Sequence, residues 1–161
     1  MNVGKIFKLG LIFGVFLASG CGQVGSKAPD FTLQRVNRAT EIALEDFRGK
    51  PVFLDFWASW CPPCRQSTPD VKRLSREFSN KIQVIGINMD QDINAARSYI
   101  RSNNIQFINL RGNQKVSSAY KVSGIPAFFI IDSEGRIVQS YSGYRSEYYD
   151  EWRREIRNII N

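Results

Sequence analysis

Hydrophobic positions along the chain alternate between short runs typical of buried strands and stretches with the spacing of amphipathic helices. Residues 51–57 read Pro-Val-Phe-Leu-Asp-Phe-Trp, an almost unbroken apolar run that predicts a central strand buried on both faces. Residues 82–89 predict a second strand of similar length. Shorter strands are expected at 31–33, 41–44, 107–110, 127–132 and 136–141, the last two joined by a Ser-Glu-Gly turn.

Between these runs, apolar residues at helical spacing predict the helices. We expect them from Cys61 to about Phe78, over 93–102, over 115–120, and from Ser146 onward. Pro69 is expected to kink the first helix, while Asp92 and Ser146 are expected to cap the second and the last. The order of strand, helix, strand, helix, strand, helix, hairpin and helix predicts an α/β fold with a central mixed β-sheet flanked by helices.

The first twenty residues have a different pattern. Lys5 and Lys8 precede an apolar run over residues 9–18, and two small residues follow it. This order of positive charge, apolar core and small residues is that of a signal peptide. The apolar run is shorter than the roughly 20 residues that span a bilayer. We therefore expect the protein to be exported, with residues 1–20 as its signal peptide.

Residues 17–21 read Leu-Ala-Ser-Gly-Cys and resemble a bacterial lipobox, in which the cysteine receives lipid and becomes the new N-terminus. This resemblance implies that Cys21 anchors the protein to a membrane, facing the periplasm or the outer cell-envelope space. Residues 21–27, small and polar, would then be a tether, and residues 28–161 one folded domain. The alternatives are an ordinary signal peptide and an uncleaved anchor with an incidental cysteine.

Composition excludes several kinds of chemistry. The chain has no histidine, which removes Ser-His-Asp and Cys-His catalysis and most zinc and copper sites. We therefore expect no metal and no other cofactor. The formal charge is +7, from 22 basic and 15 acidic residues. Because basic and acidic residues are interleaved, we expect a solvated surface and no nucleic-acid site.

The three cysteines fall into two groups. If Cys21 carries lipid, Cys61 and Cys64 remain as a pair in an exported protein, where disulfides persist. A disulfide between residues so close in sequence closes a very small loop and adds little stability. The pair is therefore expected to have a redox function instead of a structural one.

The sequence Trp60-Cys61-Pro62-Pro63-Cys64 places both thiols on the first turn of a helix, on the same side. Their Cα atoms can then lie near the roughly 5.5 Å that a disulfide needs. The helix dipole favours a negative charge on Cys61, which should lower its pKa and make it the nucleophile. Cys64 lies deeper, is expected to be less exposed, and would resolve the mixed disulfide. These features predict a thiol–disulfide oxidoreductase.

Two further features tune this chemistry. Pro62 and Pro63 have no N–H to donate to a sulfur, which favours the oxidised state and makes the protein a stronger reductant. Asp55 lies inside an apolar strand, where burial should raise its pKa. It is expected to relay the proton of Cys64. The alternative is a structural acid bonded to the backbone or to Lys50.

Residues 44–65 and the later Val-Ser-Gly-Ile-Pro-Ala-Phe-Phe-Ile-Ile-Asp at 122–132 resemble the thioredoxin superfamily, most closely its exported TlpA/ResA branch. The similarity extends from about residue 28 to the end, which makes residues 28–161 a thioredoxin-like domain. The resemblance implies a thioredoxin fold with an N-terminal β-hairpin and a central insertion over about 90–120.

The same resemblance implies roles for single residues. Pro126 would be the cis-proline beside the disulfide, and the backbone of Ile125 would pair with the substrate chain. Asp55 falls where thioredoxin has its buried acid. Ser67 stands where ResA-like members have a glutamate, and Asp55 is a candidate to replace that acid. The residues expected to contact substrate are Trp60, Pro62, Pro63, Ile125 and Pro126.

The leading functional hypothesis is an envelope reductase that acts on disulfides of client proteins, with apocytochrome c as one candidate client. It would be a monomer recharged by a membrane electron donor of the thiol type. The alternatives are a disulfide oxidant or isomerase, a thiol peroxidase, a Sco-type metal chaperone, and an anchored interaction module with an inert disulfide. The peroxidatic Pro-x-x-x-Thr-x-x-Cys pattern and the histidine of Sco proteins are absent from the sequence.

Overall fold

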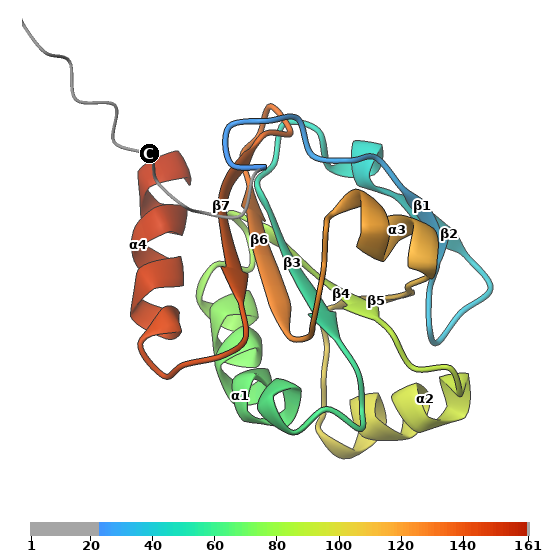
Figure 1. Cartoon of the computed structure of the whole chain (residues 1–161). Helices are drawn as coiled ribbons and strands as arrows, with labels where there is room; N and C mark the ends of the chain where they lie inside the picture. Colours follow the sequence, from blue (N-terminus) through green and yellow to red (C-terminus); the bar gives the residue numbers. More distant parts are fainter. Residues whose placement is uncertain (1–22, 161) are drawn as a thin grey trace, which may run out of the picture.

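The computed structural model describes residues 23–160, whose elements alternate between strands and helices (Figure 1). The strands are β1 (Thr32–Gln34), β2 (Glu41–Ala43), β3 (Val52–Trp57), β4 (Gln83–Asn88), β5 (Ile108–Arg111), β6 (Ala127–Ile131) and β7 (Ile137–Ser142). The helices are α1 (Pro62–Glu77), α2 (Ile93–Ser102), α3 (Gln114–Ala119) and α4 (Tyr148–Ile160), with a short 3-10 helix, η1, at Leu44–Phe47. Each predicted strand and helix is present, with ends shifted by a few residues.

Five strands form the central sheet, in the order β5-β4-β3-β6-β7, and β1 pairs with β2 in a separate hairpin. Strand β3 runs parallel to β4 and antiparallel to β6, so the sheet is mixed. All six residues of β3 are buried, as its apolar run predicts. The predicted mixed sheet, flanking helices and N-terminal hairpin are therefore confirmed.

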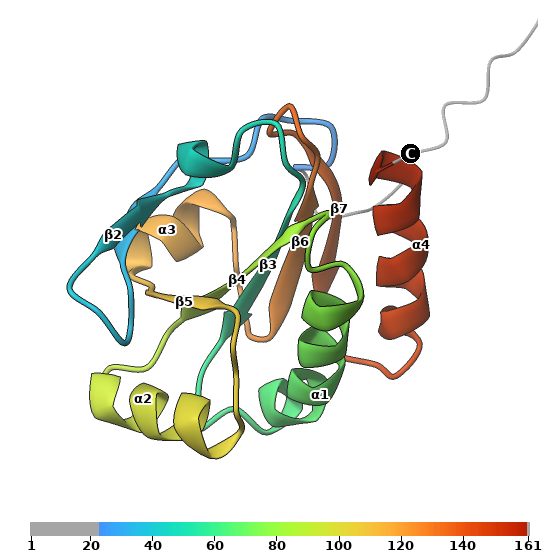
Figure 2. The same ribbon diagram turned by 180° about the vertical axis from the view of Figure 1, so that it is seen from behind.

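Alternate side chains of β3 enter two separate cores, one on each face of the sheet. Leu54 and Phe56 pack beneath the β1–β2 hairpin and α3, whereas Phe53 packs beneath α1 and α4. Figures 1 and 2 show these two layers of helices on opposite sides of the sheet. Asp55 shares the face of Phe53, because side chains of a strand alternate in direction. The acid therefore points toward the layer that contains the cysteine helix.

The sequence predicted the cap of one helix correctly and that of another wrongly. Asp92 accepts a hydrogen bond from the N–H of Asn94 at 2.9 Å and caps α2, as predicted. Cys61 occupies the capping position of α1. Helix α4 begins at Tyr148, two residues beyond the predicted cap Ser146, so that prediction was wrong.

The folded domain extends to Gln23, upstream of the predicted boundary at residue 28. Gln23 is buried and its Nε2 donates to the carbonyl of Ala119 at 2.7 Å. The N–H of Gly25 donates to the carbonyl of Ile137 at 2.8 Å. The described part of the predicted tether is thus hydrogen-bonded to the domain.

The remaining N-terminal predictions concern residues that the structure does not describe. The predicted signal peptide at 1–20 and the predicted lipid site at Cys21 both lie outside residues 23–160. Within that described range, no helix combines the length and the apolar character needed to cross a membrane.

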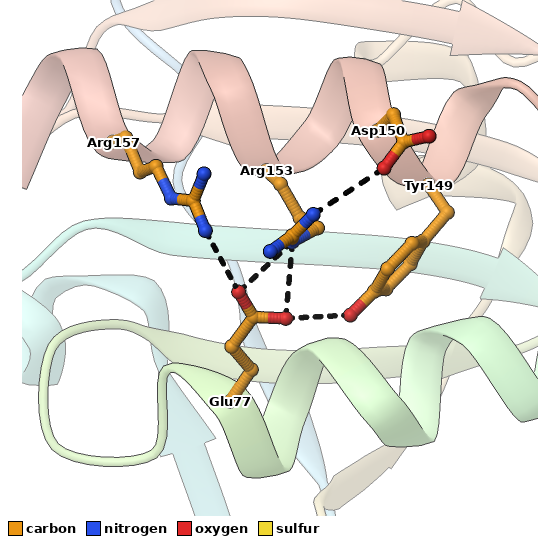
Figure 3. Close-up of polar contacts among 5 residues, drawn as sticks. All are labelled: Glu77, Tyr149, Asp150, Arg153 and Arg157. Atoms are coloured by element: carbon orange, nitrogen blue, oxygen red, sulfur yellow. Dashed lines mark hydrogen bonds and ion pairs between the residues drawn. The ribbon is translucent and has the colours of Figure 1, made fainter.

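Helix α4 is joined to α1 by a polar cluster around Glu77 (Figure 3). The Glu77 carboxylate accepts hydrogen bonds from Tyr149 at 2.6 Å and from Arg153 at 2.9 Å, and Arg157 lies 3.3 Å away. Partial burial acts to raise the pKa of Glu77, but these hydrogen bonds and positive charges outweigh it and hold the pKa below its ordinary value. The folded state therefore favours the ionised form of this residue.

We expect Glu77→Gln to lower the free energy of unfolding by about 1 kcal/mol at neutral pH, because one carboxylate makes several contacts between the helices. A depressed pKa stabilises the fold above the unfolded value of 4.5, and this stabilisation disappears as the pH falls through the folded value. Urea titrations across that range should show the two proteins converge in acid. Glu155→Gln, which removes a single ion pair with the exposed Arg154 from a half-buried carboxylate, is the matched control and should have little effect.

Candidate active site

The first turn of α1 carries the two cysteines, joined as a disulfide with their Cα atoms 5.3 Å apart. Cys61 occupies the capping position, and its Sγ accepts a hydrogen bond from the N–H of Cys64 at 3.2 Å. Pro62 and Pro63 occupy the intervening positions and have no N–H to offer. The sulfur of Cys61 therefore lies at the positive end of the helix dipole with one backbone donor from this turn.

Both cysteines are 2% exposed in the oxidised protein. The predicted difference in exposure between Cys61 and Cys64 is therefore not seen. The disulfide packs in a small apolar cluster whose other buried members come from the strand end, from α2 and from the loops around it. These members are Val36, Trp57, Ala58, Ala96, Ile100 and Ile105. Apolar surroundings of this kind limit the access of water to the sulfurs.

The loop that precedes β6 lies beside the disulfide. The Ile125–Pro126 peptide bond is cis, which agrees with the prediction for Pro126. The carbonyl oxygen of Ile125 lies 3.7 Å from Cys61 Sγ. In the disulfide the sulfur carries no proton, so this is a contact; a Cys61 thiol would be able to donate to the same oxygen. The predicted neighbours Ile125 and Pro126 therefore do lie beside the cysteines.

Trp60 forms the exposed edge of the site. It is 62% exposed, although it directly precedes the buried Cys61. A hollow of about 380 Å³ adjoins it, lined by Ser59, Trp60, Met89, Asp90, Gln91, Asp92 and Ala95. Such an aromatic surface next to the nucleophile is suited to contact with a protein chain.

The residue before Trp60 is fixed by Asp90, a contact that the sequence did not reveal. The Asp90 carboxylate accepts hydrogen bonds from the N–H of Ser59 at 2.9 Å and from its hydroxyl at 2.7 Å. The side chain of Asn88 donates to the same carboxylate at 2.6 Å. Arg65, from α1, donates to the Ser59 carbonyl at 2.8 Å. Every polar group of Ser59 is thus engaged, which holds the turn that leads into Cys61.

We expect Asp90→Asn to lower the free energy of unfolding by about 1–3 kcal/mol, because its amide cannot accept all three hydrogen bonds and buried donors would lose partners. The same change should slow disulfide reduction several-fold by loosening the turn before Cys61. Ser59→Ala removes one donor and leaves the backbone bond, so it is expected to cost less. Equal losses in both variants, measured by urea unfolding and insulin reduction, would contradict this assignment.

Asp55 is buried in the middle of β3, between the sheet partners Phe128 and Gly86. It is 4% exposed, and its Oδ1 has no hydrogen-bond partner among the described residues. Burial raises the pKa of Asp55 to about 8, in the direction that the sequence predicted. A carboxyl group with this pKa can exchange a proton near neutral pH, as a proton relay requires.

The carbonyl of Cys64 has two side-chain partners on its own helix. Ser67 donates to it at 3.0 Å and Thr68 at 2.8 Å, and the hydroxyl of Tyr99 lies 3.1 Å from that of Thr68. Ser67 is fully buried, so the site has a hydroxyl where the ResA resemblance expects an acid. Asp55 is then the buried carboxylate on this face of β3.

No group of three or more histidine, cysteine, aspartate or glutamate side chains within residues 23–160 is arranged to hold a metal ion. The residues predicted to act together come from three separate segments, namely the middle of β3, the start of α1 with the residue before it, and the loop before β6.

Comparisons with known proteins agree with this geometry. The Redoxin family profile matches residues 23–155. The chain is 33% identical to the thiol-disulfide oxidoreductase ResA of Bacillus subtilis over 125 residues, covering 76% of this chain and 69% of ResA. It is 32% identical to the thioredoxin-like protein YneN of the same species, covering 75% and 72%. A crystal structure of a putative thiol:disulfide interchange protein DsbE from Chlorobium tepidum matches with a TM-score of 0.78 and 30% identity, covering 84% and 96%.

Proposed function

Because the chain belongs to the Redoxin family and is a thiol–disulfide oxidoreductase of the ResA and DsbE type, we propose that it reduces disulfides of exported client proteins. The position of Cys61 supports this proposal most strongly. Its sulfur caps a helix and accepts a hydrogen bond from the N–H of Cys64. The two residues between the cysteines are prolines, which have no N–H to donate. This arrangement supports a thiolate that is formed readily but is stabilised by few hydrogen bonds.

The proposed reaction starts from the dithiol form. The Cys61 thiolate attacks one sulfur of a client disulfide, and the other client sulfur leaves as a thiolate that takes up a proton. In the molecules whose Asp55 is ionised, Cys64 gives its proton to the Asp55 carboxylate and attacks Cys61 Sγ. The client leaves with two thiols, and the enzyme keeps both cysteines as a disulfide. The second client sulfur leaves as a thiolate and takes up the proton that Asp55 had accepted from Cys64. Two electrons have then passed from the enzyme to the client, and the proton taken up by the first client sulfur comes from the solvent, which received the proton of Cys61 when that thiol ionised.

The proline pair favours the reducing direction over the oxidising one. A strong oxidant stabilises its reduced form by supporting the thiolate with hydrogen bonds and charge. Here Pro62 and Pro63 withhold two possible N–H donors. About 30 mV corresponds to about 1.4 kcal/mol for this couple, so one missing donor is enough to shift the equilibrium.

The cellular setting is proposed from the N-terminal sequence. Residues 1–20 are proposed to direct export, and Cys21 to carry a lipid that holds the enzyme at a membrane of the bacterial envelope. A membrane electron donor of the thiol type would regenerate the dithiol. Apocytochrome c, with its own cysteine pair, is one candidate client.

The reduction potential of the Cys61–Cys64 couple tests the reducing direction. Equilibration of the purified protein with dithiothreitol mixtures should give a value below about −250 mV, and the reduced enzyme should reduce insulin. A value near about −120 mV, in the range of strong oxidants, would overturn the reductase assignment. Consumption of hydrogen peroxide in the same preparations would favour a peroxidase instead.

A further inference from the structure

The segment 23–28 begins with a turn, in which the N–H of Ser26 donates to the carbonyl of Gln23 at 3.1 Å, and it is hydrogen-bonded to one end of the domain. Gly25 and Ser26 exchange backbone hydrogen bonds with Ile137, at 2.8 and 2.9 Å. The N–H of Ala28 donates to the carbonyl of Gly135 at 2.9 Å. Gln23 is held by Ala119, as described above. The chain is therefore fixed to the domain as far upstream as Gln23.

This attachment lies at the end of the sheet that is remote from the disulfide. Ile137 pairs with Ile131, which pairs with Val52 at the start of β3. The cysteines follow the other end of β3, after Trp57. A strand of this length spans about 17 Å, which sets a minimum separation between the two ends. Figure 1 shows the start of the coloured chain and the first turn of α1 at opposite ends of the sheet.

The predicted lipid site cannot be far from this end. Cys21 precedes Gln23 by two residues, and two residues of extended chain reach at most about 7 Å. A lipid on Cys21 would therefore bring the remote end of the domain against the bilayer. Within residues 23–160, the large apolar side chains that are exposed are Val24, at 52%, and Trp60, at 62%. Val24 lies at the attachment end and Trp60 at the disulfide end.

We propose that the end of the domain around Val24 is a membrane-facing surface, and that this surface directs Cys61 and Trp60 away from the bilayer. The clients are then cystines of proteins in the aqueous space, and cystines held at the lipid surface are poor substrates. The proposed membrane electron donor is then one whose thiols stand clear of the lipid surface. The proposal rests on the proposed lipid anchor at Cys21. To that anchor the proposal adds the orientation of the enzyme at the membrane and the class of substrate that Cys61 can then reach.

The orientation follows from the short chain between the proposed lipid site and the domain, and not from surface charge. The charged residues at this end are largely paired with one another. The pairs are Lys27 with Asp30, Arg48 with Asp30 and Glu45, and Arg136 with Glu134. Paired surface charges leave little net attraction for an anionic membrane. The same orientation is therefore expected on neutral vesicles and on vesicles with anionic lipid.

Fluorescence quenching tests the orientation. In full-length lipidated protein carrying Cys61→Ser and Cys64→Ser, one fluorophore is attached through Glu134→Cys at the Val24 end or through Gln91→Cys beside Trp60. In phosphatidylcholine vesicles with headgroup spin labels, quenching should be strong for the first site and weak for the second. Equal quenching, or the reverse order, would overturn the proposal.

Vesicle flotation separates this test from the anchor itself. The wild-type chain should float with vesicles and the Cys21→Ser variant should remain in solution. If both behave alike, the proposed anchor has failed, whatever the orientation. If only the wild type floats and quenching is equal at the two sites, the anchor stands and the orientation is wrong.

Substrate competition tests the consequence. The anchored enzyme should reduce a soluble cystine peptide as fast as Cys21→Ser does. It should reduce the same peptide coupled by a short linker to a headgroup at least about tenfold more slowly. A flexible Gly-Ser insertion between Gly22 and Gln23 should remove most of that difference, because it lets the domain turn. Equal rates on both peptides with the native tether would contradict the proposal.

Discussion

Replacement of Cys64 by alanine is expected to reduce turnover by about a thousandfold and to leave Cys61 covalently bound to client proteins. In the structure Cys64 is positioned to attack Cys61 Sγ, since the two residues already form a disulfide across one helical turn. Without that second sulfur the mixed disulfide has no internal route to release. Non-reducing electrophoresis of the variant should show adducts that dithiothreitol removes.

Cys61→Ala is the matched control for this result. It should lose turnover to a similar extent but form few adducts, because Cys64 does not occupy the capping position of the helix, where a thiolate is stabilised. Adducts of equal yield in both variants would remove the assignment of Cys61 as the nucleophile. Absence of adducts in both would contradict disulfide exchange with proteins.

Asp55→Asn is expected to stabilise the protein by about 2 kcal/mol near neutral pH and to slow the resolving step. The folded-state pKa of Asp55 is about 8, against an ordinary 3.8, because the group is buried. Between these values the folded protein holds a proton that the unfolded chain releases, so the free energy of unfolding falls as the pH rises. Asparagine does not titrate and removes that fall.

The stability gain of Asp55→Asn should therefore grow from about pH 4 to pH 8 and then level off. Urea unfolding at several pH values measures this directly. Asp150→Asn, which removes an exposed carboxylate from α4, is the control and should show no such growth. A pH-independent difference between the wild type and Asp55→Asn would mean that Asp55 is ionised in the folded protein.

The catalytic half of this prediction concerns the release of a trapped client. Single-turnover reduction of a mixed disulfide should slow about tenfold or more in Asp55→Asn, because Cys64 loses its proton acceptor. The rate of the first attack by Cys61 should change little. Equal slowing of both steps would indicate a general structural effect instead of proton transfer.

Sequence pattern predicted the sheet well because burial and periodicity are local signals. The apolar run of β3 has nearly the same limits in both descriptions, and the cysteines fall on the first turn of α1. Helix starts were harder, since a cap depends on one side chain and its local geometry. Asp92 does cap α2, whereas Ser146 lies two residues before α4.

Within the site, the sequence analysis identified the residues that belong to a motif. It missed residues that are distant in sequence and come into contact only in the folded protein. Asp90 lies 31 residues from Ser59, and nothing in the sequence around Asp90 indicates that its carboxylate binds Ser59. Gln23 belongs to a small, polar segment that is typical of a tether. Its side chain nevertheless donates to the carbonyl of Ala119, 96 residues further along the chain. The equal burial of Cys61 and Cys64 also depends on packing by α2, which no local pattern encodes.

Titration of Cys61 in the reduced protein tests the central claim, that this sulfur is an activated thiolate at a helix N-terminus. Ultraviolet thiolate absorbance, measured for the wild type and for Cys64→Ala, separates the two cysteines. The account predicts a Cys61 pKa clearly below the value of a free thiol, about 8.5. A Cys61 pKa at or above that value would contradict it.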